Sequence, residues 1–185
     1  MEALLGEIAR ARHHIHLQYY IFCDDETGRR LRDALVEKAR QGVHVRILYD
    51  DVGCSGVRKS FFEGMRREGI EVHAFLHVKF PRFTSKVNYR NHRKIVVIDG
   101  RVGFIGGMNI ADRYVRGTEW GSWRDTHFRI EGSGVAGLQI AFLSDWSATT
   151  KRHVSGSEYF PAAQRYTDNI LHHLDIYEYV VHLSV

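Results

Sequence analysis

Apolar residues follow two different periods along this chain, and the periods predict alternating helices and strands. In the segment 27–41, Leu31, Leu35 and Ala39 recur at every fourth position, as on the buried face of an amphipathic helix. The segment 95–98 is instead continuously β-branched, as in a strand buried on both faces. We expect helices at 2–12, 27–41, 60–68 and 135–146, and strands at 14–22, 43–49, 70–76, 94–99, 102–106 and 125–130.

The order of these segments indicates the fold class. The first half reads strand, helix, strand, helix, strand, which is the rhythm of parallel strands joined by crossover helices. We therefore predict an α/β fold with a mixed, largely parallel β-sheet flanked by helices on both faces. Residues 176–181 also have strand character, but the sequence does not indicate their pairing partner.

The start of the strand at 94–99 carries two residues suited to chemistry on a phosphodiester. His92 and Lys94 are two positions apart, so in an extended chain both side chains project from one face. A neutral imidazole can attack phosphorus, and a neighbouring ammonium can stabilise the charge that develops on the phosphoryl oxygens.

The next strand returns to the same place. Asp99-Gly100 is a strong hairpin-turn signal, and the strand at 102–106 follows it. Gly106 and Gly107 end this strand where a backbone could approach a ligand closely, although a glycine pair can also be only a β-turn. Asn109 then adds an amide that can bind a phosphoryl oxygen. The hairpin thus carries residues from both outer ends into one site.

These residues match the pattern HxK(x)4D(x)6GxxN, which is the signature of the phospholipase D superfamily. The wider sequence resembles the first half of bacterial cardiolipin synthases, and the resemblance covers roughly residues 1–165. Its most similar stretches are 15–22, 42–46, 49–53, 88–114, 120–127 and 142–146. Agreement distributed in this way is hard to attribute to chance.

The resemblance implies a role for each residue of the motif. His92 would be the nucleophile that forms a phosphatidyl-histidine intermediate. Lys94 and Asn109 would hold the phosphate oxygens. Asp125 would accept a hydrogen bond from the imidazole nitrogen that does not attack; a carboxylate so placed fixes the tautomer and stabilises the charged ring. The alternative for Asp125 is an exposed charge at a strand end or a partner for Arg124.

Three further residues belong to the expected site. Asp99 completes the signature and is counted with the catalytic set, although we expect its role to be architectural. Arg93 and Gly107 are counted with the phosphate-binding residues. Many members of the superfamily carry serine or threonine where this chain has Gly107. This departure is familiar from cardiolipin synthases. It removes a hydroxyl contact and disfavours assignment of the chain to the nuclease branches of the superfamily.

Phospholipase D chemistry ordinarily uses two such motifs, one histidine attacking while the other protonates the leaving alkoxide. This chain contains one HxK motif followed by a correctly spaced aspartate. Either two copies form a composite site, or the chain is half of an enzyme and lacks its general acid. We predict a catalytic domain at 1–165 and an uncertain tail at 166–185 that could begin a missing second half.

The leading hypothesis from the resemblance is a phosphatidyltransferase that makes cardiolipin from two molecules of phosphatidylglycerol. One alternative is a homodimeric phosphodiesterase or nuclease, and another is an inactive lipid-binding half-domain. We expect no cofactor, and no metal because no ligand cluster with zinc or calcium spacing is present.

Charge along the chain favours an anionic partner. The net charge is +4, and no acidic residue lies between Glu71 and Asp99. The cations of this interval are Lys79, Arg82, Lys86, Arg90, Arg93 and Lys94, and Phe75, Phe80, Pro81 and Phe83 lie among them. Such a mixture suits an anionic membrane surface or a nucleic acid, and could also be an ordinary solvated loop. Given the resemblance, we expect an anionic phospholipid rather than nucleic acid.

Size and composition are those of a globular domain, with 185 residues and 44% hydrophobic residues. Cys23 and Cys54 suggest neither a metal site nor a disulfide framework, so a reducing compartment is expected. No apolar run is long enough to span a bilayer, and no signal-peptide pattern begins the chain. We expect a fragment that is soluble or contacts a membrane peripherally. By resemblance, the parent protein would lie at the cytoplasmic side of a bacterial inner membrane.

Overall fold

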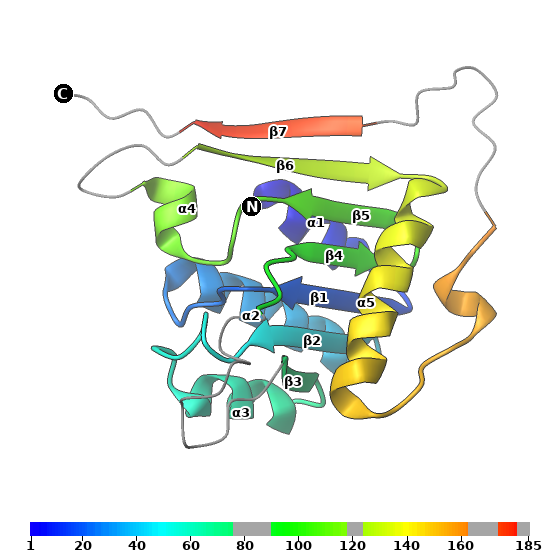
Figure 1. The fold of residues 1–185 in the computed structure, drawn as a ribbon, viewed down its shortest axis with the longest axis horizontal. Helices are drawn as coiled ribbons and strands as arrows, with labels where there is room; N and C mark the ends of the chain where they lie inside the picture. Colours follow the sequence, from blue (N-terminus) through cyan, green and yellow to red (C-terminus); the bar gives the residue numbers. More distant parts are fainter. Residues whose placement is uncertain (76–89, 118–123, 163–173, 181–185) are drawn as a thin grey trace.

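A seven-stranded sheet with the strand order β3-β2-β1-β4-β5-β6-β7 lies at the centre of the structure (Figure 1). The computed structural model describes residues 1–75, 90–117, 124–162 and 174–180. The strands are β1 (His14–Tyr19), β2 (His44–Asp50), β3 (Glu71–Phe75), β4 (Ile95–Ile98), β5 (Val102–Gly106), β6 (Arg124–Glu131) and β7 (Leu174–Val180). The helices are α1 (Glu2–Arg10), α2 (Glu26–Arg40), α3 (Lys59–Arg67), α4 (Asp112–Arg116), α5 (Gly134–Thr150) and the 3-10 turn η2 (Ser157–Tyr159).

The mixed α/β class with helices on both faces is confirmed, but the sheet is less parallel than expected. Among the seven strands that the structure describes, β1–β2 and β2–β3 are the parallel pairs. The pairs β1–β4, β4–β5, β5–β6 and β6–β7 are antiparallel. The expected alternation of parallel strands and crossover helices is therefore found for β1, β2 and β3. Residues 99–101 join β4 to β5, and so short a turn allows only antiparallel pairing because a parallel return needs a long crossover. The strands β6 and β7 join the sheet antiparallel after longer connections.

The expected helices and strands are all present, with their ends displaced by a few residues. The sequence patterns missed α4 and η2, which are too short to show a period. The strand character near residue 176 is confirmed, since β7 pairs with β6 at the edge of the sheet. The domain boundary at residue 165 stays a prediction. Among the described residues, no helix combines the length and the apolar character that crossing a membrane requires.

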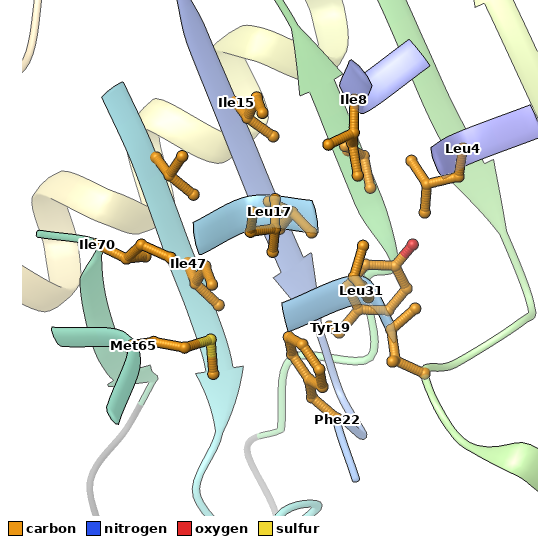
Figure 2. Packing of buried hydrophobic residues seen from close by; sticks show 14 of the residues in the cluster. Leu4, Ile8, Ile15, Leu17, Tyr19, Phe22, Leu31, Ile47, Met65 and Ile70 are labelled. Atoms are coloured by element: carbon orange, nitrogen blue, oxygen red, sulfur yellow. The ribbon is translucent and has the colours of Figure 1, made fainter. Parts of the chain in front are cut away.

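Every residue of β1 is buried, and the two faces of this strand differ in chemistry. Ile15, Leu17 and Tyr19 point to the main hydrophobic core, where α1 and α2 contribute residues such as Leu4 and Leu31 (Figure 2). The alternate residues are polar and lie beneath α5. β1 is thus held from one side by apolar packing and from the other by hydrogen bonds.

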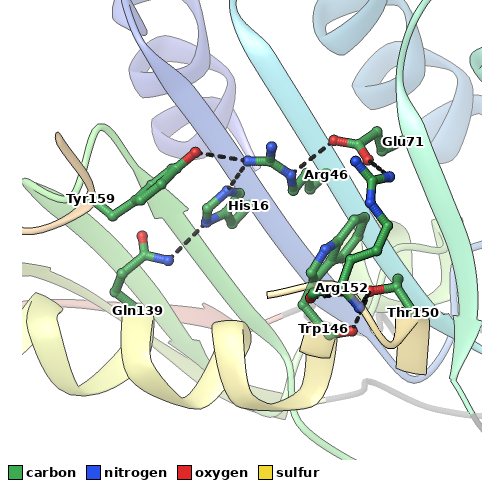
Figure 3. A network of polar contacts seen from close by, with 8 residues as sticks. All are labelled: His16, Arg46, Glu71, Gln139, Trp146, Thr150, Arg152 and Tyr159. Carbon is green, nitrogen blue, oxygen red and sulfur yellow. Dashed lines mark hydrogen bonds and ion pairs between the residues drawn. The ribbon is translucent and has the colours of Figure 1, made fainter. Parts of the chain in front are cut away.

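The histidines on the polar face of β1 belong to a hydrogen-bond network beneath α5, and Figure 3 shows the part of it around His16. Gln139 lies within hydrogen-bonding distance of His14 Nε2 (3.1 Å) and His16 Nδ1 (2.8 Å). Arg46 Nη1 lies 3.2 Å from His16 Nε2 and donates to the Tyr159 hydroxyl at 3.2 Å. Burial lowers the pKa of His14 to about 4 and holds the pKa of His16 well below its usual range. Both imidazoles are therefore neutral near pH 7.

The hairpin between β4 and β5 is tied to the start of β1 by Asp99. Its carboxylate accepts hydrogen bonds from the backbone N–H groups of Arg12 (2.9 Å), His13 (2.8 Å) and His14 (2.9 Å). Asp99 has φ +53°, in the left-handed region that aspartate tolerates better than most residues. In its expected architectural role, Asp99 therefore fastens the turn of the hairpin to the start of β1.

We predict that stability falls as the pH is lowered through the range in which these histidines titrate. An imidazole with a lower pKa in the folded state binds fewer protons when folded, so acid below the unfolded value of about 6.5 favours unfolding. For His14 the loss is about 2 kcal/mol between about pH 7.5 and about pH 5. Urea unfolding at the two pH values should show a shallower decline for His14→Gln.

The exposed His153 gives the matched control for this prediction. His153→Gln should keep the pH dependence of the unmodified chain. An equal decline in His14→Gln and the unmodified chain would show that His14 does not contribute to acid sensitivity.

Candidate active site

The strands β1, β2 and β5 end, and β4 and β6 begin, at one edge of the sheet, which is at the left in Figure 1. His92 lies just before β4 in the sequence and therefore at this edge. Residues 90–94 lead into β4 at this edge, and the His92 side chain is exposed. The imidazole stacks on the ring of Tyr20, which directly follows β1, with a centroid distance of 4.2 Å and an interplanar angle of 18°. An aromatic platform thus holds an accessible imidazole.

Lys94 shares this platform. Its ammonium lies 5.5 Å from the centroid of the Tyr20 ring, and Nζ donates a hydrogen bond to the backbone carbonyl of His92 at 2.6 Å. Partial burial lowers the pKa of Lys94, and the nearby carboxylate of Asp125 opposes that shift. The structure therefore brings His92, Lys94 and Asp125 to one end of the sheet.

Gly107 packs directly against Asp125. A Cβ atom at position 107 would lie 2.1 Å from Asp125 Oδ1, so the carboxylate occupies the space that a side chain would need. At Gly106 a Cβ would lie 2.3 Å from the backbone oxygen of Thr126. The β6 backbone therefore fills the Cβ space at Gly106, and the Asp125 carboxylate fills it at Gly107. The expected approach of a ligand to these glycines stays a prediction. The phosphate-binding role of Gly107 stays a prediction.

Asn109 is buried and fixed to the segment that follows β1. Its Oδ1 atom accepts a hydrogen bond from the backbone N–H of Ile21 at 3.0 Å. The same segment pairs with Ile110 through the bridge from Phe22. With Oδ1 engaged in this way, Nδ2 is the atom of the side chain that can donate to a phosphate oxygen.

Asp99 is the member of the expected set that the structure does not bring to this edge. It follows the far end of β4, roughly 16 Å along the strand from Lys94 at about 3.3 Å per residue. Its carboxylate is occupied by three backbone amides there. Placing it in the catalytic set is therefore corrected, because the motif aspartate secures the turn of the hairpin instead.

Arg93 was expected to bind phosphate, but in this structure it is ion-paired. Its Nη1 atom lies 2.7 Å from Asp145 Oδ2. Arg90, at the start of the same segment, forms a buried ion pair with Asp50 at 3.7 Å. Two cations of the basic interval thus balance carboxylates. The other expected surface residues of this interval, Lys79, Phe80, Pro81, Arg82, Phe83 and Lys86, lie outside the described residues.

Sequence reasoning gave no role to Tyr20 and Asp145. Tyr20 lay within a stretch similar to the family, but only the stacking geometry reveals its contact with His92. Asp145 carried a clearer signal, because it is the single carboxylate in the largely apolar helix α5. Within the described parts of the chain, no three histidine, cysteine, aspartate or glutamate side chains are grouped so that they could hold a metal ion.

Comparison with known proteins gives consistent matches. The family model described as "Cardiolipin synthase, PLD-like domain" matches residues 4–122. The major cardiolipin synthase ClsA of Bacillus subtilis is 46% identical over 153 residues, which cover 82% of this chain and 32% of that protein. A cardiolipin synthase of Geobacillus thermodenitrificans is 48% identical over 158 residues, with 85% and 32% covered. This chain spans about a third of the length of these relatives.

Solved structures share the fold at low identity. Nuc from Salmonella typhimurium, a phospholipase D family member, aligns with a TM-score of 0.58 and 16% identity, covering 83% of this chain and 90% of that one. Phosphatidylserine synthase from Haemophilus influenzae aligns with a TM-score of 0.55 and 17% identity, covering 78% and 34%. At such identity these likenesses support the fold alone.

We predict that Gly107→Ala destabilises the chain by about 1–3 kcal/mol, as overpacking does. The cause is the Asp125 carboxylate, so the penalty should shrink in an Asp125→Ala background, where the remaining Cβ would lie 3.6 Å away in ordinary contact. Urea unfolding of the two single variants and the double variant measures the coupling.

Gly137 is the matched control, because it is exposed in α5 and a Cβ atom at this position would meet nothing within 4 Å beyond the adjoining backbone of its own helix. Gly137→Ala should leave stability unchanged or raise it by up to about 1 kcal/mol. An equal cost of Gly107→Ala in both backgrounds would contradict the steric account.

Proposed function

Because the chain belongs to the family of cardiolipin synthases with a phospholipase D-like domain, we propose that it is the His92-bearing part of a phosphatidyltransferase that makes cardiolipin. The observation that carries this proposal is the exposed His92 ring, stacked on Tyr20 beside the Lys94 ammonium. In this proposal the substrate is two molecules of phosphatidylglycerol. The geometry supports it by placing an accessible imidazole and a cation at one edge of the sheet.

The proposed reaction has two displacements at phosphorus. A ring nitrogen of His92 bonds to the phosphorus of the first phosphatidylglycerol while the bond from phosphorus to the glycerol oxygen breaks. The leaving alkoxide takes a proton and departs as glycerol. A hydroxyl of the second phosphatidylglycerol then attacks, the phosphorus–nitrogen bond breaks, and cardiolipin leaves with the histidine restored.

Groups around His92 have separable tasks in this proposal. Lys94 and the Nδ2 group of Asn109 stabilise negative charge on the phosphoryl oxygens. Asp125 accepts a hydrogen bond from the His92 nitrogen that does not attack, and so favours the charged ring that forms with the phosphorus bond. Gly107 leaves room for that carboxylate. Arg93 approaches the phosphate only if it exchanges its ion pair with Asp145.

Protonation of the leaving glycerol needs a second histidine. The sequence holds one complete HxK motif, and the chain spans about a third of its relatives' length. The partner histidine therefore comes from another segment of a longer polypeptide or from a second copy of this chain. Without general acid catalysis, the first step slows by roughly a hundredfold to ten-thousandfold.

The proposed substrate indicates where the chain acts. Phosphatidylglycerol is an anionic membrane lipid, so the chain would meet it at a membrane surface; the cytoplasmic side of a bacterial inner membrane is proposed from the relationship to bacterial cardiolipin synthases. The net charge of +4 favours this approach electrostatically.

A substrate with a good leaving group tests His92 separately from the missing acid. We predict that the chain releases about one equivalent of p-nitrophenolate from the p-nitrophenyl ester of phosphatidic acid in a burst, because this leaving group needs no proton. Phosphatidylglycerol should react far more slowly. His92→Ala should abolish the burst, measured by absorbance in mixed micelles.

His92 is exposed, so the variant should keep the thermal unfolding midpoint of the unmodified chain. His153→Ala, which also removes an exposed histidine, should leave the burst intact. A burst that survives in His92→Ala would overturn the assignment of the nucleophile. Hydrolysis of DNA without reaction of the lipid ester would overturn the substrate class.

A further inference from the structure

Asp145 of α5 is joined to the residues on both sides of His92. Its Oδ2 atom accepts hydrogen bonds from Asn91 Nδ2 at 2.6 Å and Arg93 Nη1 at 2.7 Å. The same oxygen accepts from Gln18 Nε2 of β1 at 2.7 Å. One carboxylate oxygen therefore links the segment that carries His92 to the central strand and to the covering helix.

The need for such an anchor follows from the local backbone. His92 precedes β4, whose pairing with β1 extends to Ile95. Asn91 Oδ1 accepts from the backbone N–H of Arg93 at 3.0 Å, which shapes the segment locally but does not attach it to the rest of the molecule. The ion pair between Arg90 and Asp50 attaches the start of this segment, and the contacts of Asp145 attach it immediately on both sides of His92.

Because side chains alternate along this segment, the contacts of Asp145 also affect the position of the His92 ring. Asn91 and Arg93 project toward Asp145, while His92 and Lys94 project toward Tyr20. Residues with this alternation lie on opposite sides of an extended backbone. Fixing the two residues on one side therefore determines where the ring emerges on the other.

The chemistry of the anchor favours a carboxylate. All three groups that converge on Oδ2 are donors, and an ionised carboxylate is an acceptor-only side chain. The bond from Arg93 joins a guanidinium to a carboxylate and is therefore charge-assisted, and the Asp145 side chain is only 17% exposed. An asparagine would keep the shape and one acceptor oxygen, but it would lose the charge that pairs with Arg93.

We propose that Asp145 is a positioning residue for His92: it holds the flanking residues so that the imidazole stays on Tyr20 and faces the substrate. Asp145 does not contact the reacting atoms in this proposal. Only the kinetic part of its test rests on the proposed function, because the orientation of the His92 ring can be measured without substrate.

Nuclear magnetic resonance of the chain measures that orientation directly. The Tyr20 ring stacked at 4.2 Å shifts the His92 ring protons upfield, and Tyr20→Leu defines the spectrum without this effect. In Asp145→Asn we expect most of the upfield shift to be lost while the thermal midpoint shows a folded chain. Asp33→Asn is the matched control, because it removes an exposed carboxylate of α2 that pairs with Arg32.

Arg93→Met tests the same anchor from the other side and does not depend on a buried substitution, since the Arg93 side chain is 52% exposed. It should lose part of the upfield shift. His92 protons that keep their positions in Asp145→Asn overturn the proposal, and if that variant does not fold, unchanged protons in Arg93→Met overturn it. A purely structural role would lower stability without moving these signals in the folded chain.

The kinetic part uses the p-nitrophenyl ester. Asp145→Asn should slow the burst by roughly tenfold to a hundredfold, as expected for misplacement of a reacting group by about 1 Å. The lipid concentration at half-maximal rate should stay unchanged. An unchanged burst rate would contradict the positioning role. If the unmodified chain shows no burst, the proposed function fails and the magnetic resonance result still decides the role of Asp145.

Discussion

Burial of β1 on both faces is the constraint on which the rest of this structure depends. The strand pairs in parallel with β2 and antiparallel with β4, so the two differently built halves of the sheet meet along it. Its apolar face fixes α1 and α2, and its polar face requires partners from α5. Because Tyr20 follows its last residue, β1 also determines where the platform for His92 lies.

Both ends of β4 are attached to β1 or to the residues next to it, but one attachment secures the scaffold and the other lies at the candidate site. At the end of β4, Asp99 accepts three backbone hydrogen bonds from the residues that open β1. At its start, Gln18 and Asn91 both donate to Asp145, and Tyr20 stacks on His92. The signature that identifies the family therefore combines residues of two kinds. Its aspartate holds the scaffold, whereas its histidine and lysine lie at the candidate site.

Much of this could be predicted from local sequence, and the remainder could not for physical reasons. The motif spacing was enough to predict that His92 and Lys94 project to the same side of the chain, because side chains alternate along a strand with a fixed period of two residues. The contacts of Tyr20 and Asp145 depend on pairing between β1 and β4 and on the path of α5 across the sheet, which no local period encodes. The excess of antiparallel pairs was missed for a similar reason: only the β4–β5 pair follows from a short turn, whereas β1–β4 and β5–β6 pair segments that long connections separate. Gly107 showed as a departure from the superfamily, but only the position of Asp125 explains it.

The central claim is that His92 forms a covalent bond to phosphorus, and identification of the adduct tests it most directly. The chain would be reacted with the p-nitrophenyl ester of phosphatidic acid, quenched and digested at neutral pH, and analysed by mass spectrometry and phosphorus magnetic resonance. The account predicts an acid-labile phosphorus–nitrogen bond on the peptide that contains His92. A phosphatidyl group on any other residue, or release of p-nitrophenolate with no adduct at any time, would contradict it.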